Sequence, residues 1–185
     1  MRCRAGGSLS VLALIASGAA ACGSPQPGEI ASEELLELEA DQVMVDLETY
    51  MTREGLRRAH LLADTAYTYQ DEARLRLRDL EITFYGDAGQ VDGVLTAASG
   101  IYQLESGDIS VEGKVVVVDA TEGKRLTTEK LRYVATADSL YGDTAFVFYR
   151  GNAEMRGTSF VSDPGMDNIR AVSPSVIVPD VQVME

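Results

Sequence analysis

The sequence predicts an all-β fold built from repeated strand pairs, and three observations support this fold class. The first is a repeat in which one Leu and one Tyr recur together, at offsets of 33 and then 31 residues. These pairs are Leu62 and Tyr69, Leu95 and Tyr102, and Leu126 and Tyr133. The second is that Ile82 and Phe84 stand 33 positions before Val115 and Val117, so a separate pair of positions keeps the same offset. The third is that each unit reads as two strands, too few to bury an apolar face alone, so the units must stack.

Composition and charge bound the function classes. The chain has 185 residues, of which 45% are hydrophobic, and this suits one soluble domain. Its formal charge of −13 argues against nucleic acid as a partner, because binding to phosphates needs clustered Lys and Arg. The only cysteines are Cys3 and Cys22, so the folded part can hold neither a disulfide framework nor a multi-cysteine metal site.

The N-terminal residues predict export and anchoring. Arg2 and Arg4 precede a short apolar run and the small residues Ala19 to Ala21, and Cys22 follows them. This order resembles a bacterial lipoprotein signal, so we expect residues 1–21 to be a signal peptide and Cys22 to be the lipid anchor. A secretory signal that is cleaved before Cys22, or an uncleaved anchor, remains an alternative. Residues 22–41 have the composition of a tether or linker, in which residues 31–40 could form a short helix.

Alternating apolar residues predict strands from Gln42 onward, with turns at residues 53–55, 86–89 and 121–124. In the strand expected at residues 74–85 the apolar phase shifts by one position, which is typical of a β-bulge. Arg74, Arg76 and Arg78 alternate with leucines in that strand. They are either a binding row for acidic groups or, as is more common, a solvated strand face.

The repeat weakens toward the C-terminus. In a fourth unit the Leu position is Gly157 and the Tyr position is Pro164, and terminal repeats are usually atypical. Residues 172–185 are extended and contain prolines that forbid a central strand. This tail is an extra edge strand, a partner segment or a disordered end.

The sequence offers no set of residues for catalysis, so we expect neither enzymatic activity nor a cofactor. His60 is the only histidine, and the motifs of phosphate-binding loops, dinucleotide sites and nucleophile elbows are absent. The apolar positions that match across units should stack in rows. They form either a filled β core or a groove for acyl chains. The candidate groove residues are Ile82, Phe84, Leu95, Val115, Val117, Leu126, Phe146 and Phe148.

The repeat resembles the LptC family of lipopolysaccharide-export proteins over residues 42–171. The resemblance is carried by the segments at residues 95–117, 126–140 and 155–157, through their order and spacing. It implies a twisted β-jellyroll, open along one side, that holds acyl chains in its apolar interior. It also implies a periplasmic protein that accepts lipopolysaccharide from an inner-membrane ABC transporter and passes it toward the outer membrane.

The resemblance further implies a periplasmic bridge protein as the partner that receives the lipid by edge-to-edge strand pairing. The partner edge is expected around Gly157, Phe160 and Ile169. Family members usually keep a transmembrane helix, whereas this sequence predicts a lipid anchor at Cys22; the family still favours the inner membrane. The alternative function is a membrane-tethered structural lipoprotein that acts as an assembly scaffold without lipid transfer.

Overall fold

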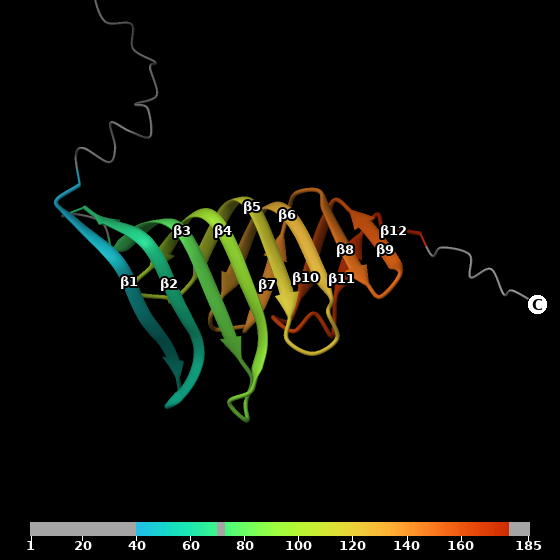
Figure 1. Cartoon of the computed structure of the whole chain (residues 1–185), viewed down its shortest axis with the longest axis horizontal. Coiled ribbons are helices and arrows are strands. Elements are labelled where there is room, and N and C mark those ends of the chain that lie inside the picture. Colours follow the sequence, from blue (N-terminus) through green and yellow to red (C-terminus); the bar gives the residue numbers. More distant parts are fainter. Residues whose placement is uncertain (1–39, 70–72, 178–185) are drawn as a thin grey trace, which may run out of the picture.

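The structure is a computed structural model that describes residues 40–69 and 73–177, and within them it contains strands and no helix (Figure 1). The predicted all-β fold is confirmed. The expected signal peptide, Cys22, the tether and nearly all of the possible helix at residues 31–40 lie outside the described residues. The strands are β1 (Gln42–Arg53), β2 (Leu56–Thr68), β3 (Arg74–Tyr85), β4 (Val91–Gln103), β5 (Ile109–Asp119), β6 (Arg125–Val134), β7 (Ser139–Gly142), β8 (Phe146–Arg150), β9 (Ala153–Gly157), β10 (Ser159–Ser162), β11 (Arg170–Val172) and β12 (Ser175–Ile177).

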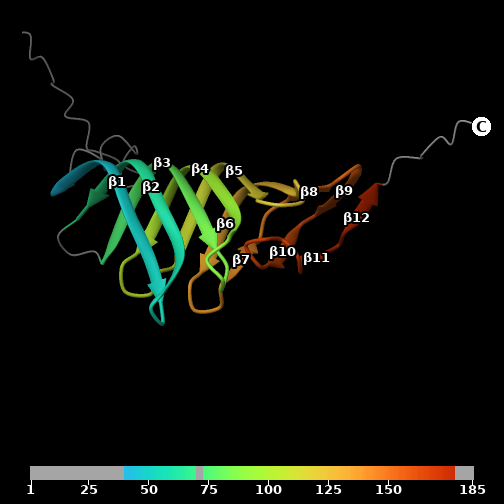
Figure 2. The same cartoon turned by 60° about the horizontal axis from the view of Figure 1, so that its bottom comes forward.

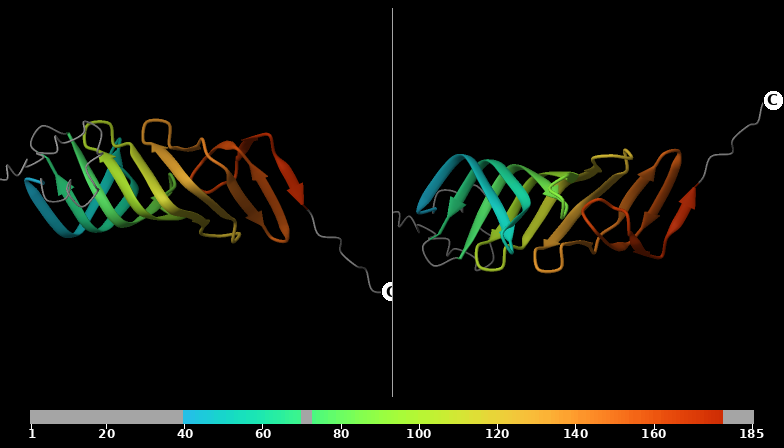
Figure 3. Two further views of the ribbon diagram at one scale, coloured as in Figure 1. Left: turned by 90° about the horizontal axis from the view of Figure 1, so that it is seen from above. Right: turned by 90° about the horizontal axis from the view of Figure 1, so that it is seen from below.

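All twelve strands belong to one antiparallel sheet, which divides at β6. One end of β6, residues 125–128, pairs with β8, which leads to β9 and β12. The other end, residues 132–134, pairs with β7, which leads to β10 and β11. We call the part that contains β8, β9 and β12 the β8 layer, and the part that contains β7, β10 and β11 the β7 layer. Figures 2 and 3 show the two layers facing each other along the roll, as in a twisted jellyroll.

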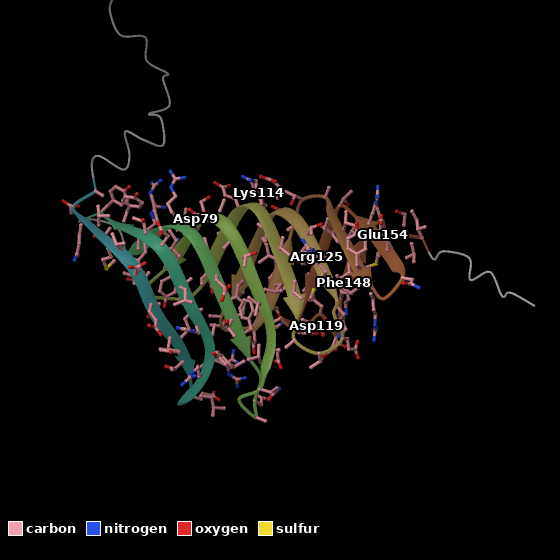
Figure 4. All side chains as sticks on the ribbon, in the orientation of Figure 1. Asp79, Lys114, Asp119, Arg125, Phe148 and Glu154 are labelled. Carbon is pink, nitrogen blue, oxygen red and sulfur yellow. The ribbon has the colours of Figure 1, made fainter. Side chains whose placement is uncertain are left out.

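The long strands β1 to β6 pass from one layer to the other through a corner. In β3 the corner is Asp79, whose φ of 44° falls in the left-handed region. Its neighbours Arg78 and Leu80 pair with Ser99 and Ala97, so the same number of residues is skipped on both strands. The expected β-bulge in β3 is therefore wrong: the phase shift is a corner, and it lets both halves of the strand point apolar side chains inward. An extra residue does occur in β5 near Lys114, and Figure 4 shows Asp79 and Lys114 along the same border.

The core lies between the layers, and aromatic residues join them. Phe84 in the β8 layer packs on Tyr133 in the β7 layer, with ring centroids 4.9 Å apart. The Tyr133 hydroxyl donates a hydrogen bond to Asp138 at 2.9 Å, so the buried ring keeps its polar atom satisfied. Phe146 and Phe160 make a second contact between the layers, edge to face, at 5.0 Å.

Two glycines make room for the second aromatic pair. Phe160 pairs across the strands with Gly142, and Phe146 pairs with Gly157. A Cβ atom at Gly157 would lie 2.6 Å from the Phe146 ring, and one at Gly142 would overlap the Phe160 ring. Gly157 interrupts the sequence repeat because it lies under an aromatic ring.

The turn between β5 and β6 contacts the loop between β10 and β11. Lys124 is buried and its Nζ atom lies 2.5 Å from Asp167 and 3.2 Å from Glu122. Burial alone would lower the pKa of Lys124, but hydrogen bonds to Asp167 and Glu122 raise it above its usual value, so the side chain stays charged. The segment that carries Asp167 also inserts the buried Met166 into the core.

Candidate functional site

The interior candidates occupy matching places in the β8 layer. Five of them form one row across five strands, in which each residue pairs with the next: Ile82, Leu95, Val117, Leu126 and Phe148. The row extends to Leu61 in β2 and to Met155 in β9. Val115 and Phe146 lie in a neighbouring row, joined through Thr128, and Phe84 faces Tyr133. The offset of 31 residues therefore predicted the register between these rows. The offset of 33 did not, because Ile82 lies in the row of Val117 and not in that of Val115.

These eight side chains are packed rather than open to solvent. Their exposed fractions range from 0% to 6%, and all belong to one hydrophobic cluster. Of the seven partly buried apolar residues packed against this cluster, five lie toward the two ends of the roll, and Tyr102 and Ala135 lie in its middle. Met44 and Leu47 in β1 are only partly buried at one end, and Met155, Ile169 and Ala171 are partly buried at the other. The interior is thus a continuous apolar layer that is filled along its middle and less covered at its ends.

The free strand edges lie at these same two ends. Within the described residues, β1 pairs only with β2, β11 only with β10, and β12 only with β9. The expected partner edge is displaced by this arrangement. Gly157 lies in β9, which is paired on both sides, and Phe160 lies in β10, which is also paired on both sides and points its ring into the core. Ile169 directly precedes the true edge strand β11.

The tail explains that displacement. Residues 170–177 contribute β11 and β12, so the first part of the predicted C-terminal tail, which begins at residue 172, completes the sheet. Three-residue strands carry too little periodicity to be recognised. The unpaired N–H and C=O groups at the C-terminal end therefore belong to β11 and β12, and those at the N-terminal end belong to β1.

A groove of about 1000 Å³ lies on the outer face of the β7 layer, away from the core. Its position follows from strand alternation: on β3, Arg76 and Arg78 line it on either side of Leu77, whose side chain is buried in the core. The same pattern repeats on β6 around Leu131 and on β10 around Phe160. None of the eight interior candidates lines this groove.

The groove gathers positive charge on an acidic protein. Among the described residues, five Lys and Arg side chains line it, whereas the acidic residues that do so there are Glu112 and Asp143. The five cations are Arg76, Arg78, Lys130, Arg132 and Arg170. Arg76 and Arg78 are half-buried, so the β3 arginines are not simply a solvated face. The sequence analysis missed Lys130, Arg132 and Arg170. Their strands, β6 and β11, are joined to β3 through other strands of the sheet, and this long-range pairing leaves no local pattern in the sequence.

Other chemistry has no support among the described residues. They contain no group of three or more metal-binding side chains, and no helix there is long and apolar enough to cross a membrane. His60 stacks on Tyr50 with centroids 4.2 Å apart and contacts Glu48 at 3.0 Å, on the exposed face of β1 and β2. The single histidine is therefore held by surface contacts.

Comparisons with known proteins agree with this architecture. A family model described as lipopolysaccharide-assembly, LptC-related, matches residues 9–163. Among solved structures, the crystal structure of LptH from Pseudomonas aeruginosa is similar, with a TM-score of 0.52 at 12% identity. The match covers 66% of this chain and 95% of LptH, which is described as the LptA-homologous periplasmic component of the lipopolysaccharide transport device. No curated protein sequence matches the chain.

At that identity the structural likeness shows a shared fold alone, whereas the family match spans most of the chain. The chain has an apolar interior that runs the length of the roll. It also has, at both ends, strands that are paired on one side only. The chain belongs to the LptC-related family of lipopolysaccharide-assembly proteins.

Proposed function

We propose that this protein is a periplasmic component of lipopolysaccharide transport that takes the lipid from an inner-membrane ABC transporter and passes it to a bridge protein. The observation that carries the proposal is the apolar interior, whose rows run from β1 at one end of the roll to β9 at the other. Acyl chains would move along these rows without contact with water, and burial of each CH₂ group favours the lipid by about 0.8 kcal/mol.

Loading requires the two layers to separate, because the interior side chains are in contact. The ends of the roll are the places where separation costs least, since Met44, Leu47 and Met155 are only partly covered there. An acyl chain that entered at one end would replace contacts between the layers with contacts to itself. The free energy for this exchange would come from the transporter.

Photo-crosslinking tests the interior track with two adjacent residues of β5. A photoreactive amino acid at Val117, which points into the core, should crosslink to lipopolysaccharide in cells that export it. The same amino acid at Val118, which points outward and is 37% exposed, should give little lipid adduct. The readout is a shift of the protein band that is detected with antibodies to lipopolysaccharide. Equal lipid adducts at both positions would contradict the track.

Handover would take place at the strand edges, where unpaired backbone groups offer a template for another strand. We assign the C-terminal edge, β11 and β12, to the bridge protein and the β1 edge to the transporter side. A photoreactive residue at Val176 in β12, which is 60% exposed, should therefore crosslink to the bridge protein. At Val45 in β1, which is 69% exposed, it should crosslink to the transporter assembly. If Val176 crosslinked to the transporter assembly and Val45 to the bridge protein, the assignment of the two edges would be reversed.

The alternative function is an assembly scaffold with a permanently filled core. The low exposure of all eight interior candidates favours this alternative in the conformation described. It predicts crosslinks to protein from Val176 and Val45 but no lipid adduct from Val117. A lipid anchor at Cys22 and residence at the inner membrane remain part of the proposal. Mass spectrometry of the mature N-terminus tests the anchor, because an unmodified Cys22 would end that idea.

A further inference from the structure

The outer groove of the β7 layer is not used by the transport track, and its residues form an ordered row. Successive strand pairs connect eight side chains across the layer, each opposite the next. They are Tyr67, Arg76, Ile101, Ser110, Arg132, Tyr141, Val161 and Arg170. A second row beside it contains Arg78, Ser99, Glu112 and Lys130.

The arginines of the first row are evenly spaced. Three strand steps separate Arg76 from Arg132, and three more separate Arg132 from Arg170. With neighbouring strands about 4.8 Å apart, each interval is roughly 14 Å. Between them lie the hydroxyl groups of Ser110 and Tyr141 and the apolar side chains of Ile101 and Val161. The row thus alternates positive charge with groups that bind sugar hydroxyls or hydrocarbon.

Contacts within the groove hold part of this charge in place. Arg76 lies over the Tyr69 ring, 5.2 Å from its centroid, and its Nε atom is buried without a hydrogen-bond partner. Arg132 lies over the Tyr141 ring at 5.7 Å. Lys130 makes an ion pair with Glu112 at 3.0 Å, so this pair adds no net charge to the groove. A guanidinium stacked on a ring keeps its N–H donors directed outward, and this suits phosphate oxygens.

From this arrangement we infer that the groove binds the phosphate-bearing headgroup of an amphiphilic lipid. Charge complementarity carries the inference, because five cations and two carboxylates line one face of a chain whose formal charge is −13. The evenly spaced arginines suit an extended headgroup with more than one phosphate, and the apolar positions suit a lipid over a free anion. The volume is within the range of small-molecule sites, about 300–1,000 Å³. The inference rests on the proposed function only in identifying the lipid with the one that is transported.

The experiment compares two double variants of the full chain in detergent micelles. Arg132→Gln with Arg170→Gln removes two exposed charges of the groove. Arg125→Gln with Arg156→Gln removes two exposed charges from the β8 layer and is the matched control. Binding of fluorescent lipid A, which carries phosphates, is measured by anisotropy, with dephosphorylated lipid A and inorganic phosphate as competitors. Urea unfolding of each variant checks that the fold is kept.

The groove variant should bind lipid A roughly tenfold more weakly for each arginine lost, and the control should bind as the parent does. Dephosphorylated lipid A should compete poorly with lipid A on the parent chain. Equal affinity of both double variants would overturn the inference, and so would inorganic phosphate that displaces the lipid at equal concentration. Tighter binding of lipid A by the groove variant would also overturn the inference. It would mean that the arginines hold an acidic segment of the chain, such as residues 29–41, and that this segment competes with the lipid.

These outcomes separate the inference from the proposed function. If lipid A binds the parent and both variants equally while Val117 still crosslinks to lipopolysaccharide, the groove has no headgroup role and the interior track stands. If the groove variant alone loses lipid A and Val117 gives no lipid adduct, the headgroup site stands and the interior track fails. If lipid A does not bind the parent chain, both are wrong.

Discussion

Replacement of Leu61 by Ala should lower the free energy of unfolding by about 2–5 kcal/mol, the usual cost of a buried Leu-to-Ala change. Leu61 has no exposed surface and pairs with Ile82 at the start of the central interior row. The removed atoms would leave a cavity between two layers that are held by long strands, so the site can collapse only partly. Urea unfolding followed by circular dichroism measures the loss as a lower midpoint with an unchanged slope.

The next residue in the chain supplies the control. Leu62 lies on the same strand, points outward and is 37% exposed, so Leu62→Ala should change the free energy of unfolding by only about 0.5 kcal/mol. The two variants share composition, strand and chemistry, and differ in the side of the sheet. Similar losses at both positions would contradict the assignment of Leu61 to a tightly packed interior.

The sequence predicted the parts of the fold that follow from local periodicity. The offset of 33 residues related Ile82 to Val115, but the structure places Ile82 in the row of Val117, two residues further on. The offset of 31 residues related Leu95 to Leu126 and Val117 to Phe148, and the structure pairs these residues in one row. This succeeded because each repeat adds two neighbouring strands, so the register follows from the spacing of residues along the chain. The corner at Asp79 was visible as a phase shift, but a shift of one position cannot distinguish a bulge from a bend.

The C-terminal third was less predictable, since its contacts depend on pairing between distant segments. Phe160 reaches β7 by skipping β8 and β9, and Arg170 reaches the groove only through β10. Neither arrangement leaves a period in the sequence. The cationic groove escaped prediction for the same reason: its arginines are separated by up to 94 positions and become neighbours only in the folded sheet. Arg76 and Arg78 were noticed as a row, but their partners across the sheet were not.

Acid stability should depend on Asp119, at the C-terminal end of β5. Its carboxylate accepts backbone N–H groups from Thr121 at 3.2 Å, Glu122 at 2.7 Å and Lys124 at 2.5 Å. Burial by itself raises the pKa of Asp119, but the hydrogen bonds from the Glu122 and Thr121 backbones and then from Lys124 outweigh it, and the pKa is lowered. The carboxylate therefore stabilises the turn that positions Lys124.

The pH dependence follows from that direction. Because the pKa of Asp119 is lower in the folded chain than its usual value of 3.8, the stabilisation is fully present above that value. It is lost as the pH falls below 3.8 toward the folded pKa. Asp163, which accepts N–H groups from Asp167 and Asn168, has a pKa that is lowered in the same way and acts in the same window. The urea midpoint should thus be steady at neutral pH and should fall below about pH 4.

Replacement of Asp119 by Ala should remove much of that pH dependence and cost about 2–4 kcal/mol at neutral pH, because it leaves three N–H groups of a partly buried turn without an acceptor. The Lys124 ammonium would then be less firmly placed against Asp167, 2.5 Å away in the intact contact, and the loop that inserts Met166 into the core would loosen. Glu105→Ala, in the exposed β4–β5 turn, is the matched control for charge loss in a hairpin. A variant of Asp119 that kept the acid-induced fall of the parent would show that Asp163 or other carboxylates dominate it.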